Sequence, residues 1–335
     1  MEIRKLQLTG GSSIAITLPK AWVERTGLRA GDAVGCVARQ DGTLLVTPKP
    51  TRKPAVQTLE LELGPESSEH LFRRLVGAYL NGYDIIQLHS KTAMTAEQRA
   101  TVRKAVRRAI GLEVVDEGPR GITIQDFLDP TEFPLEKGVR RMAAIAQAMY
   151  AEAVAGLGGT LSVDAGLEER DSEVDRLYWL INKQYHSLLR DARLAESLGL
   201  SPSQALNFLL VARLIERTAD HAQRIGENVA ELQGVKADAA LVRKVQRMSD
   251  DSLAIFQDAM TAFFKRDPKL ANDAIDRAGR VHAAKRALVH DVMDLRGPPA
   301  VALAYILESV ERTASYGSDI AEIAINHVVA AAAGE

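Results

Sequence analysis

Hydrophobic and polar positions follow two different periods along the chain, and the change falls near residue 130. Before it, apolar and polar residues alternate in short runs such as IRKLQLT, SIAITLP and VQTLELEL, which is typical of half-buried strands. After it, apolar positions recur at helical spacing through 135–157, 167–194, 202–233, 238–265, 268–295 and 299–331. The pattern predicts a multidomain α+β chain whose second half consists of six long helices.

The first fifty residues are expected to form four short strands and one short helix. Gly10–Gly11 mark a turn between the first two strands, KAWVERTG predicts a helix that ends at Gly27, and Asp41–Gly42 predict a hairpin turn between AVGCVARQ and TLLVTP. A domain of residues 1–50 encloses too small a core to fold well alone, so we expect it to dimerise. The stretch TPKPTRKPAV predicts a linker over 51–56.

A small α/β or ferredoxin-like module is expected over 57–130. It would contain two strand–helix units, with Ser67 or Ser68 capping the first helix, and a closing hairpin made by LEVVDEG and GITIQDFL. It has no glycine-rich phosphate loop and no nucleophile with a neighbouring base. We interpret its basic run RATVRKAVRR as a solvated helix face rather than a nucleic-acid surface.

An internal repeat decides how the six helices are grouped. IERTADHAQRIGENV begins at Ile215, and a near copy, VERTASYGSDIAEIA, begins at Val310. A repeat of this length indicates a duplicated structural unit. We therefore expect two three-helix bundles, over 134–234 and 238–331, rather than a single antiparallel bundle of six helices.

Charge is distributed unevenly over this layout. The net charge is −2, but residues 1–54 carry nine Lys or Arg against four acids, a balance of +5 that leaves −7 for the remainder. This asymmetry fits a head that meets a polyanion, and equally a small domain that is merely basic. The single cysteine, Cys36, fits a reducing compartment, and no apolar run could cross a bilayer or act as a signal peptide. We expect a soluble, cytoplasmic protein without membrane insertion.

Two of the predicted helices carry pairs of acidic residues one turn apart. Asp171 and Asp175 lie in ERDSEVDRLYWLI, and Glu216 and Asp220 lie beside the expected buried stripe of the later helix, which consists of Ile215, Thr218, Ala222, Ile225 and Val229. If the two helices run antiparallel, all four carboxylates converge and require a counterion, either an arginine or a bound cation. The ordinary alternative is a solvated acidic face.

Such an oxygen-rich site suits a divalent or trivalent metal ion, with Fe, Mn, Mg or Zn as candidates. His221 follows Asp220 directly but is turned about 100° from it around the helix. We therefore expect His221 to be a surface or capping residue rather than a metal ligand.

The second copy departs from this pattern. Aligning DRAGRVHAAKR with DSEVDRLYWLI sets Asp276 against Asp171 and Arg280 against Asp175. In the later helix Ser315 replaces Asp220, and the acids that remain are Glu311 and Asp319. Our hypothesis is a degenerate second cluster in which a guanidinium replaces the cation, formed by Asp276, Arg280, Glu311 and Asp319.

The segment SSIAITLPKAWVERTGLRAGDAV resembles the AbrB/SpoVT-type swapped-hairpin domain, over about the first fifty residues. The resemblance implies an intertwined homodimer that forms a swapped-hairpin β-barrel, whose surface commonly binds DNA near the start of the first strand. The corresponding residues here are Arg4 and Lys5, with Lys20 and Arg25 as further candidates. Some members of that family only dimerise or bind a partner protein.

The segments DSEVDRL, ARLIERTADH and FFKRDPKLANDAI resemble the PhoU family of phosphate-signalling proteins, over about 135–331. The resemblance implies two three-helix bundles, metal clusters on the bundle surface, and a role in restraining phosphate uptake and its gene response. The layout as a whole is similar to that of archaeal phosphate uptake regulators that join an AbrB-type head to a PhoU-type body.

Three functions remain open at this point. In the first, the head binds operator DNA and the body relays phosphate status through a phosphate transporter ATPase, a sensor kinase or metal-bound phosphate. In the second, the protein is an adaptor that dimerises through its head and docks a membrane partner without binding DNA. The third, a metal-dependent hydrolase, is disfavoured because no histidine-rich ligand set and no activated nucleophile is present. We therefore expect a regulator that is not an enzyme.

Overall fold

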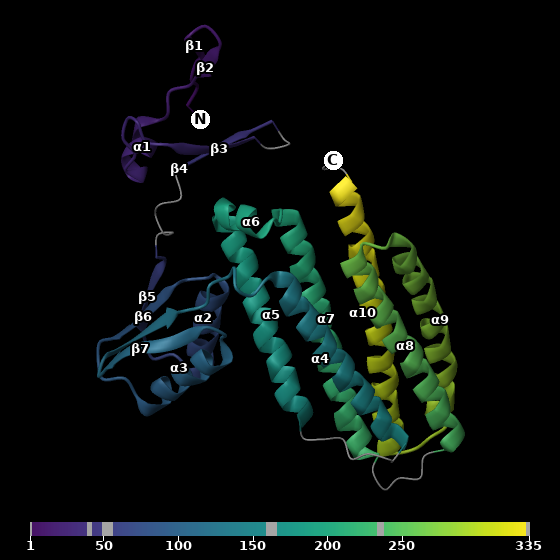
Figure 1. Cartoon of the computed structure of the whole chain (residues 1–335). Coiled ribbons are helices and arrows are strands. Elements are labelled where there is room, and N and C mark those ends of the chain that lie inside the picture. The colour runs from purple at the N-terminus through teal and green to yellow at the C-terminus, as the bar shows by residue number, and fades with distance from the viewer. Residues whose placement is uncertain (1, 39–41, 49–55, 159–165, 233–237, 333–335) are drawn as a thin grey trace. The chain divides into compact units, whose positions relative to one another are not determined.

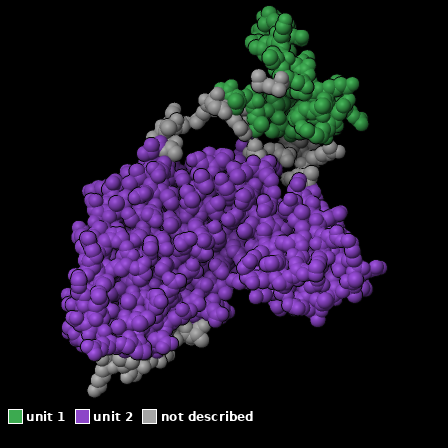
Figure 2. Space-filling view, turned by 180° about the vertical axis from the view of Figure 1, so that it is seen from behind, with its two compact units in different colours: residues 1–55, 334 green, residues 56–333, 335 purple. Residues whose placement is uncertain are grey.

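The computed structural model of this 335-residue chain describes residues 2–38, 42–48, 56–158, 166–232 and 238–332. It divides into two compact units, residues 1–55 and residues 56–333 (Figure 2). The linker was predicted over 51–56, and its residues 51–55 lie outside the described residues. Asp41 and the helix breaks expected at Gly159 and Gly234 also lie outside them.

The first unit contains two hairpins and one short helix. Strand β1 (Gln7–Thr9) pairs with β2 (Ser13–Ala15), and β3 (Val34–Ala38) pairs with β4 (Leu44–Pro48), both antiparallel. Helix α1 (Lys20–Thr26) ends at Gly27, as the sequence predicted, and Gly27 has a positive φ of 67°. None of the residues in this unit whose burial the structure describes is buried. The first hairpin is also shorter than predicted, because strands without a packing partner on either face gain little from extension.

The second unit begins with a four-stranded sheet and two helices. In chain order these are β5 (Thr58–Leu63), α2 (Ser68–Leu80), β6 (Ile85–Ser90), α3 (Ala96–Arg108), β7 (Leu112–Gly118) and β8 (Gly121–Asp126). The strand order is β5-β6-β8-β7, with β5 and β6 parallel and the other neighbours antiparallel. A ferredoxin-like module would place a helix between the last two strands. Of the two expectations, the α/β alternative is therefore the correct one.

Local sequence explains where the two helices of this module begin. The side chain of Ser67 accepts a hydrogen bond from His70 N, and Thr95 and Gln98 form a reciprocal capping box at the start of α3. Both helices share one hydrophobic cluster with the sheet. Gly111, between α3 and β7, has a φ of 92°, which permits the turn into the hairpin.

The remaining helices form two three-helix bundles, as predicted (Figure 1). The first contains α4 (Leu135–Ala155), α5 (Gly166–Arg190) and α7 (Pro202–Glu231), and the second contains α8 (Ala239–Lys265), α9 (Pro268–Met293) and α10 (Pro298–Ala332). The helix predicted to reach residue 194 ends at Arg190 and is followed by the short helix α6 (Ala192–Leu198). A 3-10 turn, η1 (Gly156–Gly158), follows α4.

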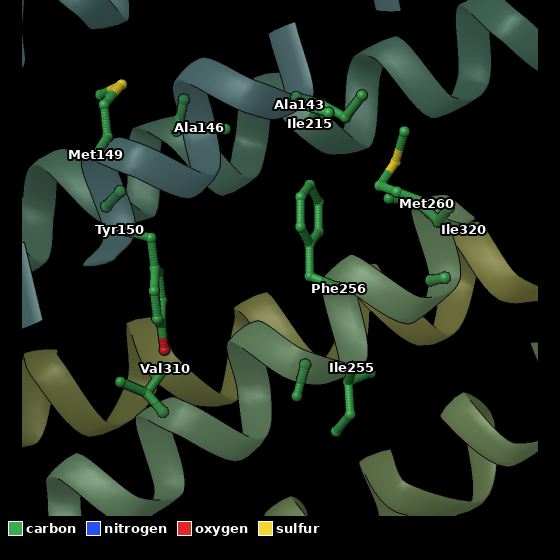
Figure 3. Packing of buried hydrophobic residues seen from close by; sticks show 14 of the residues in the cluster. Ala143, Ala146, Met149, Tyr150, Ile215, Ile255, Phe256, Met260, Val310 and Ile320 are labelled. Atoms are coloured by element: carbon green, nitrogen blue, oxygen red, sulfur yellow. The ribbon is translucent and has the colours of Figure 1, made fainter. Parts of the chain in front are cut away.

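One hydrophobic core runs through both bundles, because α7 packs against α10. In Figure 3, Phe256 of α8 points toward α4 and α7, where Ala143 and Ile215 lie. Tyr150 of α4 donates a hydrogen bond to the carbonyl oxygen of Ser249 on α8, at 3.3 Å. The predicted stripe of α7 is fully buried in this core. No helix in the described ranges is long and apolar enough to cross a membrane.

Candidate carboxylate site

Helices α5 and α7 bring the four predicted acidic residues together in the first bundle. The apolar positions between them, such as Val174 on α5 and Ala219 on α7, are buried in the core. Their burial fixes the rotation of each helix and leaves Asp171, Asp175 and Glu216 half-buried at its margin, whereas Asp220 is exposed. The acids Asp171, Asp175, Glu216 and Asp220 repel one another across the two helices as well as along them.

Burial makes this concentration of negative charge unfavourable. Loss of water, followed by repulsion from Asp175 and Asp220, raises the pKa of Asp171 to about 7. Burial and then the charge of Asp220 raise the pKa of Glu216 to about 7. The pKa values of Asp175 and Asp220 are also raised, first by burial. The site therefore holds protons near neutral pH or requires added positive charge.

Two arginines supply part of that charge. Arg213 of α7 donates a hydrogen bond from Nη1 to Glu216 Oε1, at 2.8 Å. Arg108, at the end of α3 in the α/β module, donates from Nη2 to Asp175 Oδ2, also at 2.8 Å. The second oxygen of Glu216, Oε2, is buried and has no hydrogen-bond partner. The carboxylates are therefore only partly neutralised by the protein itself.

Arg108 is a site residue that the sequence interpretation missed. It belongs to the basic run on α3 that we interpreted as a solvated face. Most of that run instead contacts the protein: Arg99 and Arg103 pair with Glu117, and the Lys104 ammonium lies 5.4 Å from the centroid of the Phe72 ring. Only tertiary structure could show this, because the partner of Arg108 lies far along the chain in another fold element.

The four carboxylates have the chemistry of a metal site but are not arranged as one. All donors are carboxylate oxygens, which suit hard cations, and Glu216 Oε2 is a buried acceptor without a donor. Among the residues that the structure describes, however, no three His, Cys, Asp or Glu side chains form a group that could hold a metal ion. Metal binding by these residues therefore stays a prediction.

The second cluster is organised differently from the hypothesis. Glu311 of α10 contacts Lys285 Nζ at 3.3 Å, and its Oε1 lies 2.6 Å from Nδ1 of His282, both on α9. Asp276 and Arg280 are exposed. The idea that Arg280 neutralises this cluster is wrong, because α9 turns Lys285 rather than Arg280 toward α10.

The other two predicted positions do not extend this second cluster into an acidic site. Ser315 donates its hydroxyl to the carbonyl oxygen of Glu311 one turn earlier, at 3.1 Å. Asp319 lies further along α10 beside Glu322, and its pKa is raised by burial and then by that neighbour. A lysine-bound glutamate thus replaces the carboxylate group of the first bundle.

His221 joins the two bundles and is neither a surface nor a capping residue, contrary to expectation. Its Nδ1 lies 3.1 Å from Ser309 Oγ and its Nε2 lies 3.4 Å from Tyr316 Oη, both on α10. Burial lowers the pKa of His221 to about 4, so the ring is neutral near pH 7. The structure thus turns His221 toward α10 rather than toward the carboxylates.

The predicted DNA-binding residues of the first unit are all exposed: Arg4, Lys5, Lys20 and Arg25. Arg4 pairs with Glu2, and Lys20 Nζ lies 3.7 Å from Glu24 Oε1. Apolar side chains are exposed in the same unit, since Leu8 and Ile14, which face each other across β1 and β2, are 73% and 68% exposed. This unit offers basic and apolar surface but no core of its own in the described residues.

The fold and its acidic helices place the chain among proteins built from duplicated three-helix bundles. The family model described as PhoU domain matches residues 139–229 and 245–324, together about half of the chain. The chain therefore belongs to the PhoU family. A second model, described as antidote-toxin recognition MazE, bacterial antitoxin, matches residues 7–54.

Comparison with solved structures finds one that shares the fold of the helical region. The chain is similar to PhoU from Pseudomonas aeruginosa, with 16% identity, a TM-score of 0.51, and coverage of 58% of this chain and 96% of that one. It is also similar to the phosphate transport system regulatory protein PhoU from Streptococcus pneumoniae, with 19% identity, a TM-score of 0.46, and coverage of 58% and 92%. No curated protein matches the sequence.

Proposed function

We propose that this protein regulates phosphate uptake, as a homodimeric DNA-binding transcriptional regulator whose PhoU body senses phosphate status. The observation that carries the proposal is the PhoU match over both bundles in a chain that also has an AbrB/MazE-type head. Regulation of this kind takes place in the cytoplasm and needs no catalytic residue.

The head supports dimerisation because its described residues bury nothing within one chain. Ile3, Leu6 and Ile16 are exposed there in addition to Leu8 and Ile14. Apolar surface of this extent is stable in water only when it is covered. A second head supplies the cover, and dimerisation would bring two sets of Arg4 and Lys5 into one assembly.

The body supports cation-dependent sensing through the carboxylate site. A divalent or trivalent cation (Fe, Mn, Mg or Zn) would neutralise carboxylates that burial disfavours and would give Glu216 Oε2 a partner. Asp171, Asp175, Glu216 and Asp220 would hold it, and it would supply positive charge that can attract phosphate. A phosphate transporter ATPase or a sensor kinase would then respond to whether the cation and phosphate are bound to the PhoU region.

DNA binding is tested by its salt dependence. The full-length protein is titrated onto its own upstream DNA at several salt concentrations, as wild type and with Arg4→Ala and Lys5→Ala combined. If each residue neutralises a phosphate, the slope of log K against log salt falls by about two per chain. A matched control combines Arg107→Ala and Arg243→Ala, which removes the same charge from exposed positions outside the head. Equal slopes in all three proteins would remove Arg4 and Lys5 from the DNA surface.

A second candidate is an adaptor that binds proteins only. Two observations favour it: the MazE family is described by recognition of a toxin, and Arg4 and Lys20 are each already paired with an acid of the same unit. The same titration separates the two functions. A stable dimer that shows no preference for its upstream DNA over unrelated DNA would favour the adaptor.

A further inference from the structure

We propose that the groove between α4 and α8 binds a purine nucleotide with a single phosphate group. The groove lies where the first bundle meets the second, and it has a free volume of about 490 Å³. Ligand sites in proteins usually have volumes of about 300–1,000 Å³. Both bundles line this groove, so a bound molecule would contact both halves of the duplicated body. The proposal concerns a ligand and a surface that the proposed function does not use.

The groove has an apolar floor and polar walls. Ala143 of α4 and Met260 of α8 are only 4% and 3% exposed, so the floor is the outer edge of the hydrophobic core. The side-chain amides of Gln147 and Gln257 line the groove and make no hydrogen bond with the residues that the structure describes. Each amide can donate and accept, as the edge of an adenine base does. The groove therefore offers a base an apolar surface and two free hydrogen-bonding groups.

One end of the groove holds a guanidinium in a stacked position. The central carbon of the Arg140 guanidinium lies 3.7 Å from the centroid of the Phe264 ring. Glu136, one turn earlier on α4, accepts two hydrogen bonds from Arg140, from Nε at 2.9 Å and from Nη2 at 2.6 Å. The Phe264 ring packs in turn against Phe263, which is only 2% exposed. The ring and the carboxylate thus hold the guanidinium plane in one position.

The other face of this guanidinium can accept a planar ligand. The Arg140 side chain remains 52% exposed, although the ring and the ion pair cover part of it. Nucleic-acid bases stack on guanidinium planes as they do on aromatic rings. A base placed there would complete a stack of ring, guanidinium and base. An aliphatic ligand would gain little from this plane, which is why we assign a heteroaromatic one.

The charges that line the groove favour one anionic group. Glu136 balances Arg140, whereas Lys265 forms no ion pair with the residues that the structure describes. Lys265 lies in the last turn of α8, next to Phe264, and is exposed. Its ammonium would bind the phosphate of a nucleotide whose base stacks on Arg140. One uncompensated positive charge matches one phosphate group better than a chain of three.

The experiment measures binding of AMP and of GMP by the full-length protein in isothermal titration calorimetry. Arg140→Lys keeps the charge but removes the plane, and it should raise the Kd for the nucleotide about tenfold. Arg141→Lys is the matched control, because Arg141 is the next residue on the helix and also pairs with a glutamate, Glu173. It should leave the Kd unchanged. Ribose 5-phosphate, which lacks the base, should bind more weakly than either nucleotide.

Lys265→Gln tests the phosphate contact separately. It should raise the Kd for the nucleotide about two- to fivefold, as removal of an exposed charge contact does, and leave the Kd for the nucleoside unchanged. Lys269→Gln removes the same charge from an exposed position on α9 and should alter neither value. Ala144→Leu, at an exposed position in the groove wall, fills the space and should weaken binding of nucleotide and nucleoside alike.

Three results would overturn the assignment. If neither nucleotide binds the wild type with a Kd below about 1 mM, the groove is not a nucleotide site. If ribose 5-phosphate binds as tightly as the nucleotides, the base makes no contact. If wild type, Arg140→Lys and Ala144→Leu share one Kd, the nucleotide binds elsewhere on the protein. None of these results bears on the head or on the carboxylate site, so the proposed function is tested separately.

Discussion

Asp171 and Glu216 show how much a position on a helix can change an ordinary carboxyl group. Each lies next to the buried stripe of its helix and each faces further acids, and these two conditions raise both pKa values to about 7. Their spacing was readable from sequence, because residues four apart share one helix face. The arginine and lysine that come to acids from another helix were not readable, because Arg108 reaches Asp175 of α5 from α3 and Lys285 reaches Glu311 of α10 from α9. The spacing of residues within one helix does not predict which residues of another helix they contact.

The pH dependence of stability follows from these carboxyl groups. Their pKa values of about 7 in the folded chain exceed the unfolded values of 3.8 and 4.5, so the folded state binds protons more tightly. In buffer that contains a metal chelator, the midpoint temperature of thermal unfolding should therefore fall as pH rises from about 4 to about 7. Asp171→Asn and Glu216→Gln should each flatten this fall and raise the midpoint at pH 8. Glu69→Gln, at an exposed position, serves as the control, and an equal slope in all four proteins would contradict the prediction.

The buried ion pair between Lys183 and Asp126 should contribute to the stability of the fold. Lys183→Met removes the cation that pairs with the buried Asp126 carboxyl group, and it should lower the free energy of unfolding by about 3–5 kcal/mol in urea titrations. Adding Asp126→Asn should recover part of the loss, since the uncompensated charge is then removed. Lys244→Met breaks an exposed pair with Asp291 and should cost about 1 kcal/mol or less. Similar losses for both lysines would refute the assignment of a buried pair.

The sequence predicted where each helix lies along the chain better than it predicted which elements pack against one another. Capping and breaking residues such as Ser201, Pro268 and Pro298 lie where helices begin, and a long apolar period dominates every helix between them. The extra helix break at Asp191 was missed, because neither proline nor glycine marks it. The order of strands in the sheet was also open, since alternation predicts that a strand exists but not which strand it pairs with.

Close packing of α10 against α8 depends on one glycine. A Cβ atom at Gly317 would lie 2.9 Å from Ile255 Cγ2 and 3.1 Å from the backbone of Phe256. Gly317→Ala should therefore separate the two helices and lower the free energy of unfolding by about 1–3 kcal/mol. Gly279→Ala on α9 is the matched control, because nothing lies within 4 Å of its added Cβ. It should stabilise the protein by about 0.5–1 kcal/mol, and a gain at both positions would disprove the close approach.

At the scale of the whole molecule, the two units differ in what holds them together. Residues 56–333 share large hydrophobic clusters, whereas the described part of residues 1–55 has no buried side chain. Sequence predicted this contrast, since four short strands enclose little volume. It could not supply the arrangement of a partner chain, because that depends on surfaces and not on periodicity.

We predict that the protein dimerises through its first unit. Leu8→Asp places a charge in the apolar surface of the first hairpin, and a charge buried there without a partner is strongly unfavourable. Light scattering after gel filtration should show a dimer for the wild type and a monomer for this variant. Leu206→Asp alters an exposed leucine of α7 and should remain a dimer. If the Leu8→Asp protein elutes with the mass of the wild type, the subunit contact lies elsewhere.

The packing of α7 against α10 also bears on how the chain is made. Contacts such as that between His221 and Ser309 join segments that leave the ribosome at different times. Until α10 is synthesised, the nascent first bundle exposes an apolar helix face that only the later half can cover. A chaperone would have to cover that face until α10 has been synthesised. Production of the first bundle as an isolated fragment should therefore lead to aggregation.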